Sequence, residues 1–262
     1  MNNAISIHTY NDKWPFMLQN EAKAIIEALP DLIDIHHVGS TSVPSLSAKP
    51  IIDIIVVVRD RNAAISPLEK LGYTFKGEYN IPFRSYFNKA GFNLHMYEEG
   101  HSEITLNLTF RDFLRTHPKE RQEYEALKNK LANESDASIK KGMFKTYTLG
   151  KDAFIKECLK NAGYIGIRFL KATHYTELDL ARRYCDDALI QDPNHHHLVL
   201  YEGIELIGYG HVDPRNIISY WVKEKWEKHF KELLLKWVKK EQYVDNSSTF
   251  NPWSFNKLDE II

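Results

Sequence analysis

A Gly-Ser pair, one acid and the strand that carries it are the residues best placed to handle a phosphate. Gly39 and Ser40 form a predicted tight turn, and Asp53 lies near the start of the apolar run IIDIIVVV, residues 51–58. Glycine allows close backbone approach to an anion, serine adds a hydroxyl donor, and a strand carboxylate could hold a divalent metal. This layout suits nucleotidyl transfer. The alternative is that Ser40 or Ser42 caps a short helix and Asp53 accepts bonds from that turn.

Histidines offer a second set of metal-ligand side chains, in two runs. His36 and His37 lie in a predicted strand, where successive side chains alternate between faces, so they are not expected to bind one metal together. The run NHHH, residues 194–197, opens another strand, and at most His195 and His197 could share a zinc ion. With no cysteine nearby and few acids, a polar loop end is the favoured interpretation.

The composition indicates a soluble globular protein and argues against several other classes. The chain has 262 residues, of which 43% are hydrophobic and 26% charged, as in a soluble globular protein of one large or two modest domains. The net charge of −1 gives no reason to expect a broad nucleic-acid surface. Cys158 and Cys185 fall in helix-like sequence without CxxC spacing, which argues against a disulfide framework or a structural zinc site.

The start of the chain and its apolar runs favour a cytoplasmic protein. The opening residues MNNAISIHTYNDKW lack a basic segment followed by an apolar one, so no signal peptide is predicted. The apolar run at residues 50–58 is shorter than the roughly 20 residues that cross a bilayer. We therefore expect no membrane partner.

The periodicity of residues 1–162 predicts an α+β domain, a mixed sheet followed by helices. Its helices are predicted from one-sided apolar spacing, at 12–29, 62–72, 110–117, 118–132 and 138–161. Its strands are predicted at 32–38, at 51–58, where both faces are buried, and in three aromatic-rich segments at 73–80, 83–90 and 92–99. The three aromatic-rich segments are separated by turn residues and suit antiparallel pairing.

Residues 163–262 predict a second, smaller α/β unit. Strands are expected at 165–171 and 217–222, and a hairpin turning at Glu202-Gly203 within 197–212. Helices are expected at 177–189 and 223–238, and the tail from 243 to 255 reads as irregular. The domain boundary is placed at about residues 161–166.

The stretch HVGSTSVPSLSAKPIIDIIVVV, residues 37–58, resembles the signature of the GrpB family of uncharacterised proteins, which is assigned to the nucleotidyltransferase fold. Further segments agree in order, namely FRSYFNK, NLHMYEEG, FRDFLRTHP, YEALKNKLA and YTLGKDAFIKECL. The resemblance spans about residues 6–160. It implies a nucleotidyltransferase-like fold, whereas a fold does not by itself fix a function.

Carried over to this sequence, the resemblance implies one pocket. The residues it implies for catalysis are Asp53, which would also hold Mg²⁺, together with His95 and Asp112. Those it implies for phosphate or substrate binding are Gly39, Ser40, Lys49, Arg84, Arg111, Arg115, Tyr147 and Lys151. The basic side chains could neutralise phosphate or carboxylate oxygens, and histidine could act as a base or metal ligand. Ordinary structural roles stay open: a solvated lysine, a core histidine, or an acid near a helix start.

One position departs from the implied chemistry. Active nucleotidyltransferases usually carry two acids two residues apart on this strand, and here Ile55 occupies the second position. Because Mg²⁺ requires several oxygen ligands in octahedral array, Asp53 alone binds it poorly. Nucleotide or phosphorylated-ligand binding without turnover therefore stays open.

The second unit, over residues 165–240, is similar to part of a GNAT acetyltransferase fold. In such enzymes a glycine-rich turn before the last helix presents N–H groups to the coenzyme A pyrophosphate. Here the turn has no glycine, and Trp226, His229 and Phe230 would crowd the phosphate, although Lys223, Lys225 and Lys228 could partly compensate. The unit is interpreted as a degenerate or truncated module.

Three functions follow as hypotheses. The first is a nucleotidyltransferase-fold enzyme in which a hydroxyl or amine of a small substrate attacks the α-phosphate of an NTP, with Asp53 helping to hold Mg²⁺, or a protein of this fold that binds the nucleotide without turnover. The second is an acetyl-CoA-dependent N-acetyltransferase based on residues 165–240. The third is a non-catalytic module in which the second unit covers the first or mediates a homodimer.

Overall fold

The chain forms two compact units in the computed structural model, which describes residues 5–134, 144–172, 192, 194–215, 217–242 and 249–252. The N-terminal unit comprises Met1–Tyr79 and Phe83–Tyr164. The C-terminal unit comprises Asn80–Pro82 and Ile165–Ile262. Each unit is built on its own five-stranded sheet.

The sheet of the N-terminal unit is mixed, as predicted. Its strands are β1 (Leu32–Val38), β2 (Ile52–Val58), β3 (Thr74–Phe75), β4 (Ser85–Lys89) and β5 (Phe92–Glu98), and they lie in the order β1-β2-β5-β4-β3. β2 pairs with β5 in parallel, and the other neighbours are antiparallel. β2 and β5 are both interior strands, and the continuous apolar run of β2 suits a strand that is covered on both faces.

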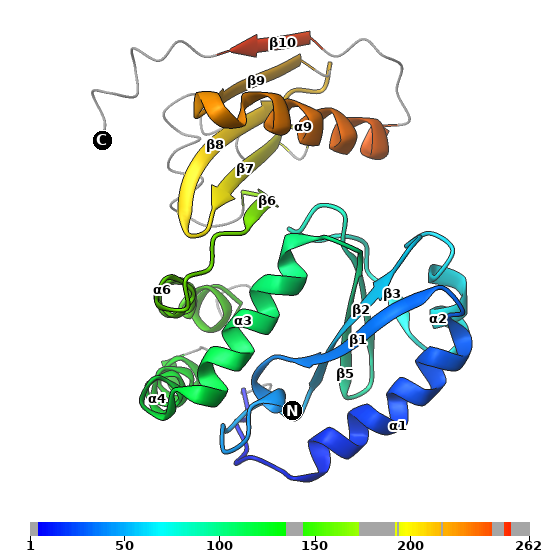
Figure 1. The fold of residues 1–262 in the computed structure, drawn as a ribbon, viewed down its shortest axis with the longest axis vertical. Helices are drawn as coiled ribbons and strands as arrows, with labels where there is room; N and C mark the ends of the chain where they lie inside the picture. Colours follow the sequence, from blue (N-terminus) through cyan, green and yellow to red (C-terminus); the bar gives the residue numbers. More distant parts are fainter. Residues whose placement is uncertain are drawn as a thin grey trace. The chain divides into compact units, whose positions relative to one another are not determined.

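One face of this sheet is covered by two helices, α1 (Lys13–Ala28) and α2 (Ile65–Lys70). Figure 1 shows both on the same side of the sheet, with α3 on the other side. Ile52, Ile54 and Val56 of β2 point to this face and pack in one apolar cluster with Ile25 of α1 and Leu68 of α2. The residues between them, Asp53 included, therefore point to the opposite face.

The helices on the other side are α3 (Ser102–Thr116), α4 (Pro118–Glu134) and α6 (Asp152–Asn161), with a π-helical turn, η2, at Phe144–Leu149. The prediction that helical structure begins at Phe110 was wrong, because α3 begins at Ser102. Its start carries β-branched residues that obscure the helical pattern. The His101 side chain caps it by accepting a bond from the Glu103 amide, and burial of Leu106 fixes the first turns. Of the helix predicted over 138–161, residues 135–143 lie outside the described part.

The C-terminal unit has an almost wholly antiparallel sheet in the order β10-β9-β8-β7-β6. Its strands are β6 (Ile167–Lys171), β7 (His196–Glu202), β8 (Glu205–Val212), β9 (Ile217–Val222) and β10 (Thr249–Pro252). The predicted hairpin at Gly203, which has φ of 61°, is confirmed. The predicted irregular tail was wrong in part, because β10 pairs in parallel with β9. Such pairing depends on an edge supplied by a distant segment, which a local pattern cannot reveal.

The helix α9 (Glu227–Gln242) packs closely on this sheet. A Cβ atom at Gly210 of β8 would lie 2.9 Å from Leu234 Cδ2, and one at Gly208 would lie 3.3 Å from the Phe230 ring. These two glycines therefore let the helix approach the strand at short range. The predicted helix at 177–189, with Cys185, lies outside the described residues.

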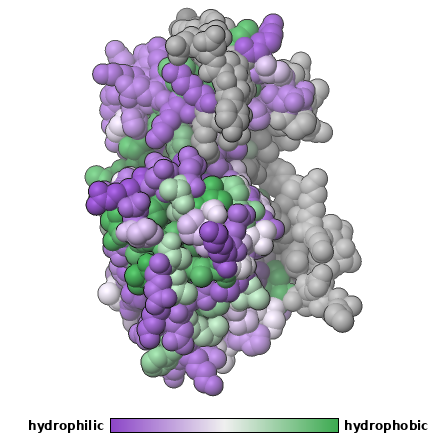
Figure 2. Space-filling model, turned by 90° about the vertical axis from the view of Figure 1, so that its right-hand side faces the viewer, coloured by the Kyte–Doolittle hydropathy of each residue, from purple (hydrophilic) through white to green (hydrophobic). Residues whose placement is uncertain are grey.

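The surface of the N-terminal unit mixes polar and apolar side chains. Figure 2 shows hydrophobic side chains gathered on one face of this unit and bordered by hydrophilic ones. Large apolar side chains that stay exposed include Phe16 and Ile26 of α1. Over the described ranges, none of the helices has the length and apolar character that a membrane crossing requires.

Candidate functional site

A cavity of about 200 Å³ lies at the start of β2 in the N-terminal unit. It is bordered by the turn after β1, the start of β2 and β5, and the chain around η2. Its polar lining residues are Ser40, Thr41, Lys49, Asp53, Asn93, Tyr147, Thr148 and Lys151. Segments far apart in the sequence thus bring two lysines, one carboxylate and several hydroxyl or amide groups to one place.

Asp53 is held by the backbone turn beside it. Its partner in the β1–β2 ladder is Val38, and the chain leaves β1 through Gly39, whose φ is +70°. A Cβ atom at Gly39 would lie 2.3 Å from Asp53 Oδ2. Glycine is therefore required at this position for two reasons: the left-handed backbone and the close approach of the carboxylate.

Replacing Gly39 with alanine is expected to lower the free energy of unfolding by about 2–4 kcal/mol, because strain at a positive φ is added to a clash with Asp53. The control is Gly100→Ala, where φ is +83° and no atom lies within 4 Å of the added Cβ. That variant is expected to lose about 1 kcal/mol. Urea unfolding measures both, and equal losses would contradict the role assigned to the carboxylate contact.

A chain of polar side chains orients the carboxylate on its other side. Asn93 Nδ2 donates to Asp53 Oδ1 at 3.0 Å, and Asn93 Oδ1 accepts from the Tyr86 hydroxyl at 2.9 Å. His95 Nε2 lies 3.9 Å from Asp53 Oδ1, and Arg84 Nη1 lies 3.3 Å from His95 Nδ1. A guanidinium can only donate, so Nδ1 is the acceptor and a neutral His95 carries its proton on Nε2. In this state His95 offers Asp53 a donor and is not poised as a base.

The two lysines of the cavity face one aromatic ring. Lys49 Nζ lies 4.0 Å and Lys151 Nζ 4.5 Å from the centre of the Tyr147 ring. Burial lowers the pKa of Lys49, while the charge of Asp53 opposes that shift. Burial and the nearby Lys49 charge lower the pKa of Lys151 to about 8. The protein thus holds two like charges in a partly desolvated site, which an anion would relieve.

A third lysine lies buried behind this pair. Lys128 of α4 is 1% exposed, and its ammonium donates to the carbonyl oxygen of Ser47. Burial, together with the Lys151 charge, lowers its pKa to about 7. Tyr124, one turn earlier on α4, forms a hydrogen bond with the Ser40 side chain, which ties α4 to the Gly39–Ser42 turn.

Two arginines of α3 bind the backbone of that turn. Arg111 donates to the His37 carbonyl at 3.0 Å, and Arg115 donates to the Ser42 carbonyl at 2.7 and 3.1 Å. Asp112 accepts from both, with bonds of 2.8 and 3.0 Å from Arg111 and 3.3 Å from Arg115, and these bonds lower the pKa of its carboxyl. In this arrangement the three side chains fasten α3 to the turn.

The donor set around Asp53 does not fit a metal held by protein side chains. One carboxylate oxygen is used by Asn93 and the other faces Gly39, while Asp112 is bound to arginines. Mg²⁺ requires near-octahedral oxygen coordination. Among the described residues, no three His, Cys, Asp or Glu side chains gather as metal ligands would.

The histidines of the C-terminal unit stack rather than converge. His211 of β8 lies between His195 and His197, with ring centres 5.0 Å from each and planes tilted by 7° and 19°. His195 Nδ1 and His211 Nε2 share a bond of 2.8 Å. Burial, with the two neighbouring imidazoles, lowers the pKa of His211 to about 4, so His211 is neutral at pH 7.

Comparison with known proteins places the chain in a family. The sequence profile described as GrpB protein matches residues 4–161, which is more than half of the chain. The chain belongs to the GrpB family. Its GrpB region is 41% identical over 166 residues to the UPF0157 protein YqkA of Bacillus subtilis, covering 60% of this chain and 47% of YqkA. The chain therefore spans about half the length of that relative.

One solved structure agrees with the GrpB assignment. The conserved protein GrpB from Enterococcus faecalis has 34% identity and a TM-score of 0.54, over 60% of this chain and 96% of that one. Cid1 poly(U) polymerase aligns over 47% of this chain with 12% identity and a TM-score of 0.30. The family match ends at residue 161, and the GNAT likeness predicted for the C-terminal unit stays a prediction.

The residues implied by the GrpB resemblance are divided between three places. Ser40, Lys49, Asp53, Tyr147 and Lys151 line the cavity, and Gly39 touches Asp53. Arg84 and His95 lie next along the sheet, whereas Arg111, Asp112 and Arg115 bind the turn instead of lining the cavity in the described structure. Their predicted roles toward substrate stay predictions.

Sequence reasoning missed Asn93, Tyr124 and Lys128. A period of two in β5 puts Asn93 on the same face as His95, and this signal could have identified it. Tyr124 and Lys128 are one helical turn apart on the buried side of α4, and a lysine within an apolar stripe is the signal that could have drawn attention. Their contacts with Ser40 and Ser47 could not be predicted, because these residues are far apart in the sequence.

Proposed function

We propose that the N-terminal unit binds the phosphates of a nucleotide in the cavity at the start of β2. The observation that carries this proposal is the pair of ammonium groups 4.0 and 4.5 Å from the Tyr147 ring centre, in a cavity with one carboxylate. Two desolvated cations outnumber the single anion, so the cavity favours an anionic guest. Ser40 also lines the cavity, whereas the Thr41 hydroxyl is buried and donates to the Ile51 carbonyl at 3.1 Å.

We favour nucleotide binding over metal-dependent nucleotidyl transfer as the role of this cavity. Ile55, the position two residues after Asp53 on the same face, is fully buried and apolar, so it supplies no second carboxylate. A transferase that neutralises a leaving pyrophosphate with metal needs more oxygen ligands than Asp53 provides. The lysines instead supply the positive charge.

Substitution of Asp53 by asparagine separates the two possibilities. For binding through lysines, Asp53→Asn removes a competing negative charge, and the Kd for a nucleoside triphosphate is expected to fall about 3- to 10-fold in EDTA. Isothermal titration calorimetry with and without Mg²⁺ measures this. If the wild-type protein binds the triphosphate only with Mg²⁺, and Asp53→Asn abolishes that binding, Asp53 is a metal ligand and the preference for lysine-driven binding is wrong.

A second candidate concerns the C-terminal unit. Parallel β9 and β10 are joined through α9 at the edge of an otherwise antiparallel sheet, an arrangement that favours the GNAT-like alternative and acetyl-CoA as ligand. Against it, the turn between β9 and α9 is filled by side-chain bonds, since Lys225 and Trp226 both donate to Glu202. Stabilisation by acetyl-CoA in a thermal shift assay would move this candidate ahead.

A further inference from the structure

The face of the N-terminal sheet beside the cavity carries an unbroken row of polar side chains. Direct cross-strand partners share a face, and the register pairs Thr74 with Asn88, Asn88 with Asn93, and Asn93 with Asp53. The row thus runs from Asp53 in β2 to β3 at the sheet edge. The residues between them in the strands, such as Phe87 and Leu94, are buried on the opposite face.

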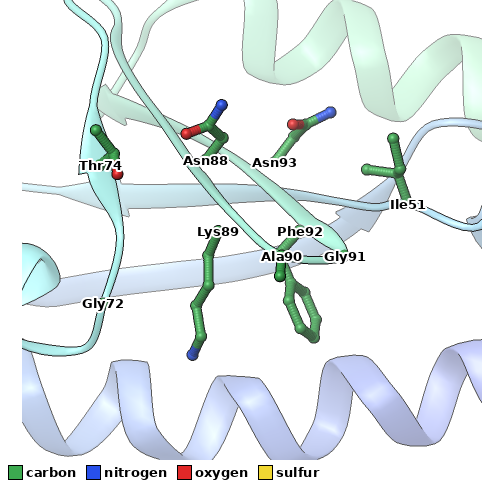
Figure 3. Close-up of a pocket in the computed structure, with 9 residues that line it drawn as sticks. All are labelled: Ile51, Gly72, Thr74, Asn88, Lys89, Ala90, Gly91, Phe92 and Asn93. Carbon is green, nitrogen blue, oxygen red and sulfur yellow. The ribbon is translucent and has the colours of Figure 1, made fainter. Parts of the chain in front are cut away.

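A second, larger cavity lies around the end of the β4–β5 hairpin, where it meets this row. Its volume is about 440 Å³, and its lining includes Thr74, Asn88 and Asn93 of the row together with Lys89 and Phe92. Figure 3 shows Asn88 and Asn93 projecting to one side of the β4–β5 hairpin, while Lys89 and Phe92 project to the other. Asn93 and Ile51 also line the smaller cavity, so the two cavities adjoin.

The two asparagines of the row differ in how their amide groups are used. Both ends of the Asn93 carboxamide are bonded, to Asp53 and to Tyr86. The Asn88 carboxamide has no hydrogen-bond partner within the part of the chain that the structure describes, and its side chain is exposed. It therefore offers both a donor and an acceptor to a ligand.

Aromatic rings flank the same face. Tyr86 lies two residues from Asn88 on β4, so both side chains point the same way. Tyr79 is 59% exposed and meets Tyr86 edge-to-face, with ring centres 5.3 Å apart. The Tyr86 ring is itself packed against the Arg84 guanidinium, 5.2 Å from its centre, and against His95. A ligand ring bearing donors and acceptors on its edge would find a carboxamide at its edge and the exposed Tyr79 ring beside its face.

We propose that Asn88 and Asn93 of this row, together with Tyr86, form the subsite for the nucleobase of the ligand whose phosphates occupy the smaller cavity. This inference rests on the proposed function. Asp53 and Asn88 are two strand spacings apart, roughly 10 Å, so one ligand must reach across a ribose to contact both ends. A nucleotide has this construction: anionic at one end, planar with paired donors and acceptors at the other.

Comparing the Kd of a nucleoside monophosphate with that of ribose 5-phosphate measures the contribution of the nucleobase, because both ligands carry the same phosphate and sugar. Calorimetry on the full chain is expected to show at least one nucleoside monophosphate binding roughly 10-fold more tightly than ribose 5-phosphate. In Asn88→Ala this advantage is expected to drop roughly 5-fold, with the Kd for ribose 5-phosphate unchanged. The matched control is Asn20→Ala, another exposed asparagine, on α1.

The possible outcomes separate this subsite from the phosphate site. Equal binding of ribose 5-phosphate and every nucleotide, unaffected by Asn88→Ala, would remove the nucleobase subsite and leave phosphate binding standing. Binding of free nucleosides that depends on Asn88 but not on Lys49 would support the subsite and overturn the phosphate assignment. If neither sugar phosphate nor nucleotide binds, the proposed function fails and the subsite with it.

Discussion

Replacing Lys49 and Lys151 together with glutamine is expected to weaken nucleotide binding roughly 1,000-fold, and each single replacement roughly 10- to 100-fold. A charge-assisted hydrogen bond to phosphate contributes about 1.5–3 kcal/mol, and tenfold in affinity corresponds to about 1.4 kcal/mol. Glutamine keeps the length and a donor but removes the charge. Because the two ammonium groups repel each other in the free protein, their replacement is not expected to destabilise the fold.

The pH dependence of binding gives an independent test of the same pair. With a pKa of about 8, Lys151 loses its proton in the free protein as the pH rises above 8. Nucleotide affinity is therefore expected to fall between pH 8 and 9.5 in the wild type, and this fall should be smaller in Lys151→Gln. The control is Lys160→Gln, an exposed lysine of α6. If Lys160→Gln reduces the pH-dependent fall in affinity as much as Lys151→Gln does, only bulk charge matters.

The sequence predicted much of the fold because the apolar periodicity of β1, β2, β4, β5 and α1 is strong and local. The same pattern misplaced the start of α3, where a histidine cap and one buried leucine fix the helix despite β-branched neighbours. It also omitted β10, since a short parallel strand depends on the edge of β9. Local periodicity carries no information about either effect.

The candidate site was predictable only in part. Gly39, Ser40 and Asp53 lie close in sequence, and their contact follows from β1 and β2 being neighbours. The direction of an arginine side chain does not follow from its type, so Arg111 and Arg115 were expected at phosphate and instead bind carbonyl oxygens. Lys128 was overlooked because exposed lysines are the rule and a buried one is identified only by its contacts.

The stability of the N-terminal unit is expected to rise by about 2 kcal/mol between pH 7 and pH 9 through Lys128. Its pKa is about 7 in the folded protein against 10.5 in the unfolded chain. Between these values the unfolded chain binds more protons, so the free energy of unfolding increases as the pH rises. Above pH 9 the raised pKa of Cys158, about 11, acts in the opposite direction, which limits the window.

Lys128→Met is expected to flatten this pH dependence, because methionine fills the same space without a charge. Hydrogen exchange of β2 amides, measured by mass spectrometry at pH 7, 8 and 9 after correction for intrinsic exchange rates, reports the opening free energy of this unit alone. Lys130→Gln serves as the control, since that lysine is on α4 but 70% exposed. A slope that persists in Lys128→Met would assign the pH dependence to Lys151 or Lys49 instead.

The parallel pairing of β2 with β5 has a kinetic consequence. It joins residues 52–58 to residues 92–98, and the cavity further requires residues 147–151. Contacts this distant in the chain close large loops and form late in folding, after the local β1–β2 hairpin. A ligand in the cavity would therefore stabilise the native state more than the transition state. Its binding is expected to slow unfolding and to leave the rate of folding nearly unchanged.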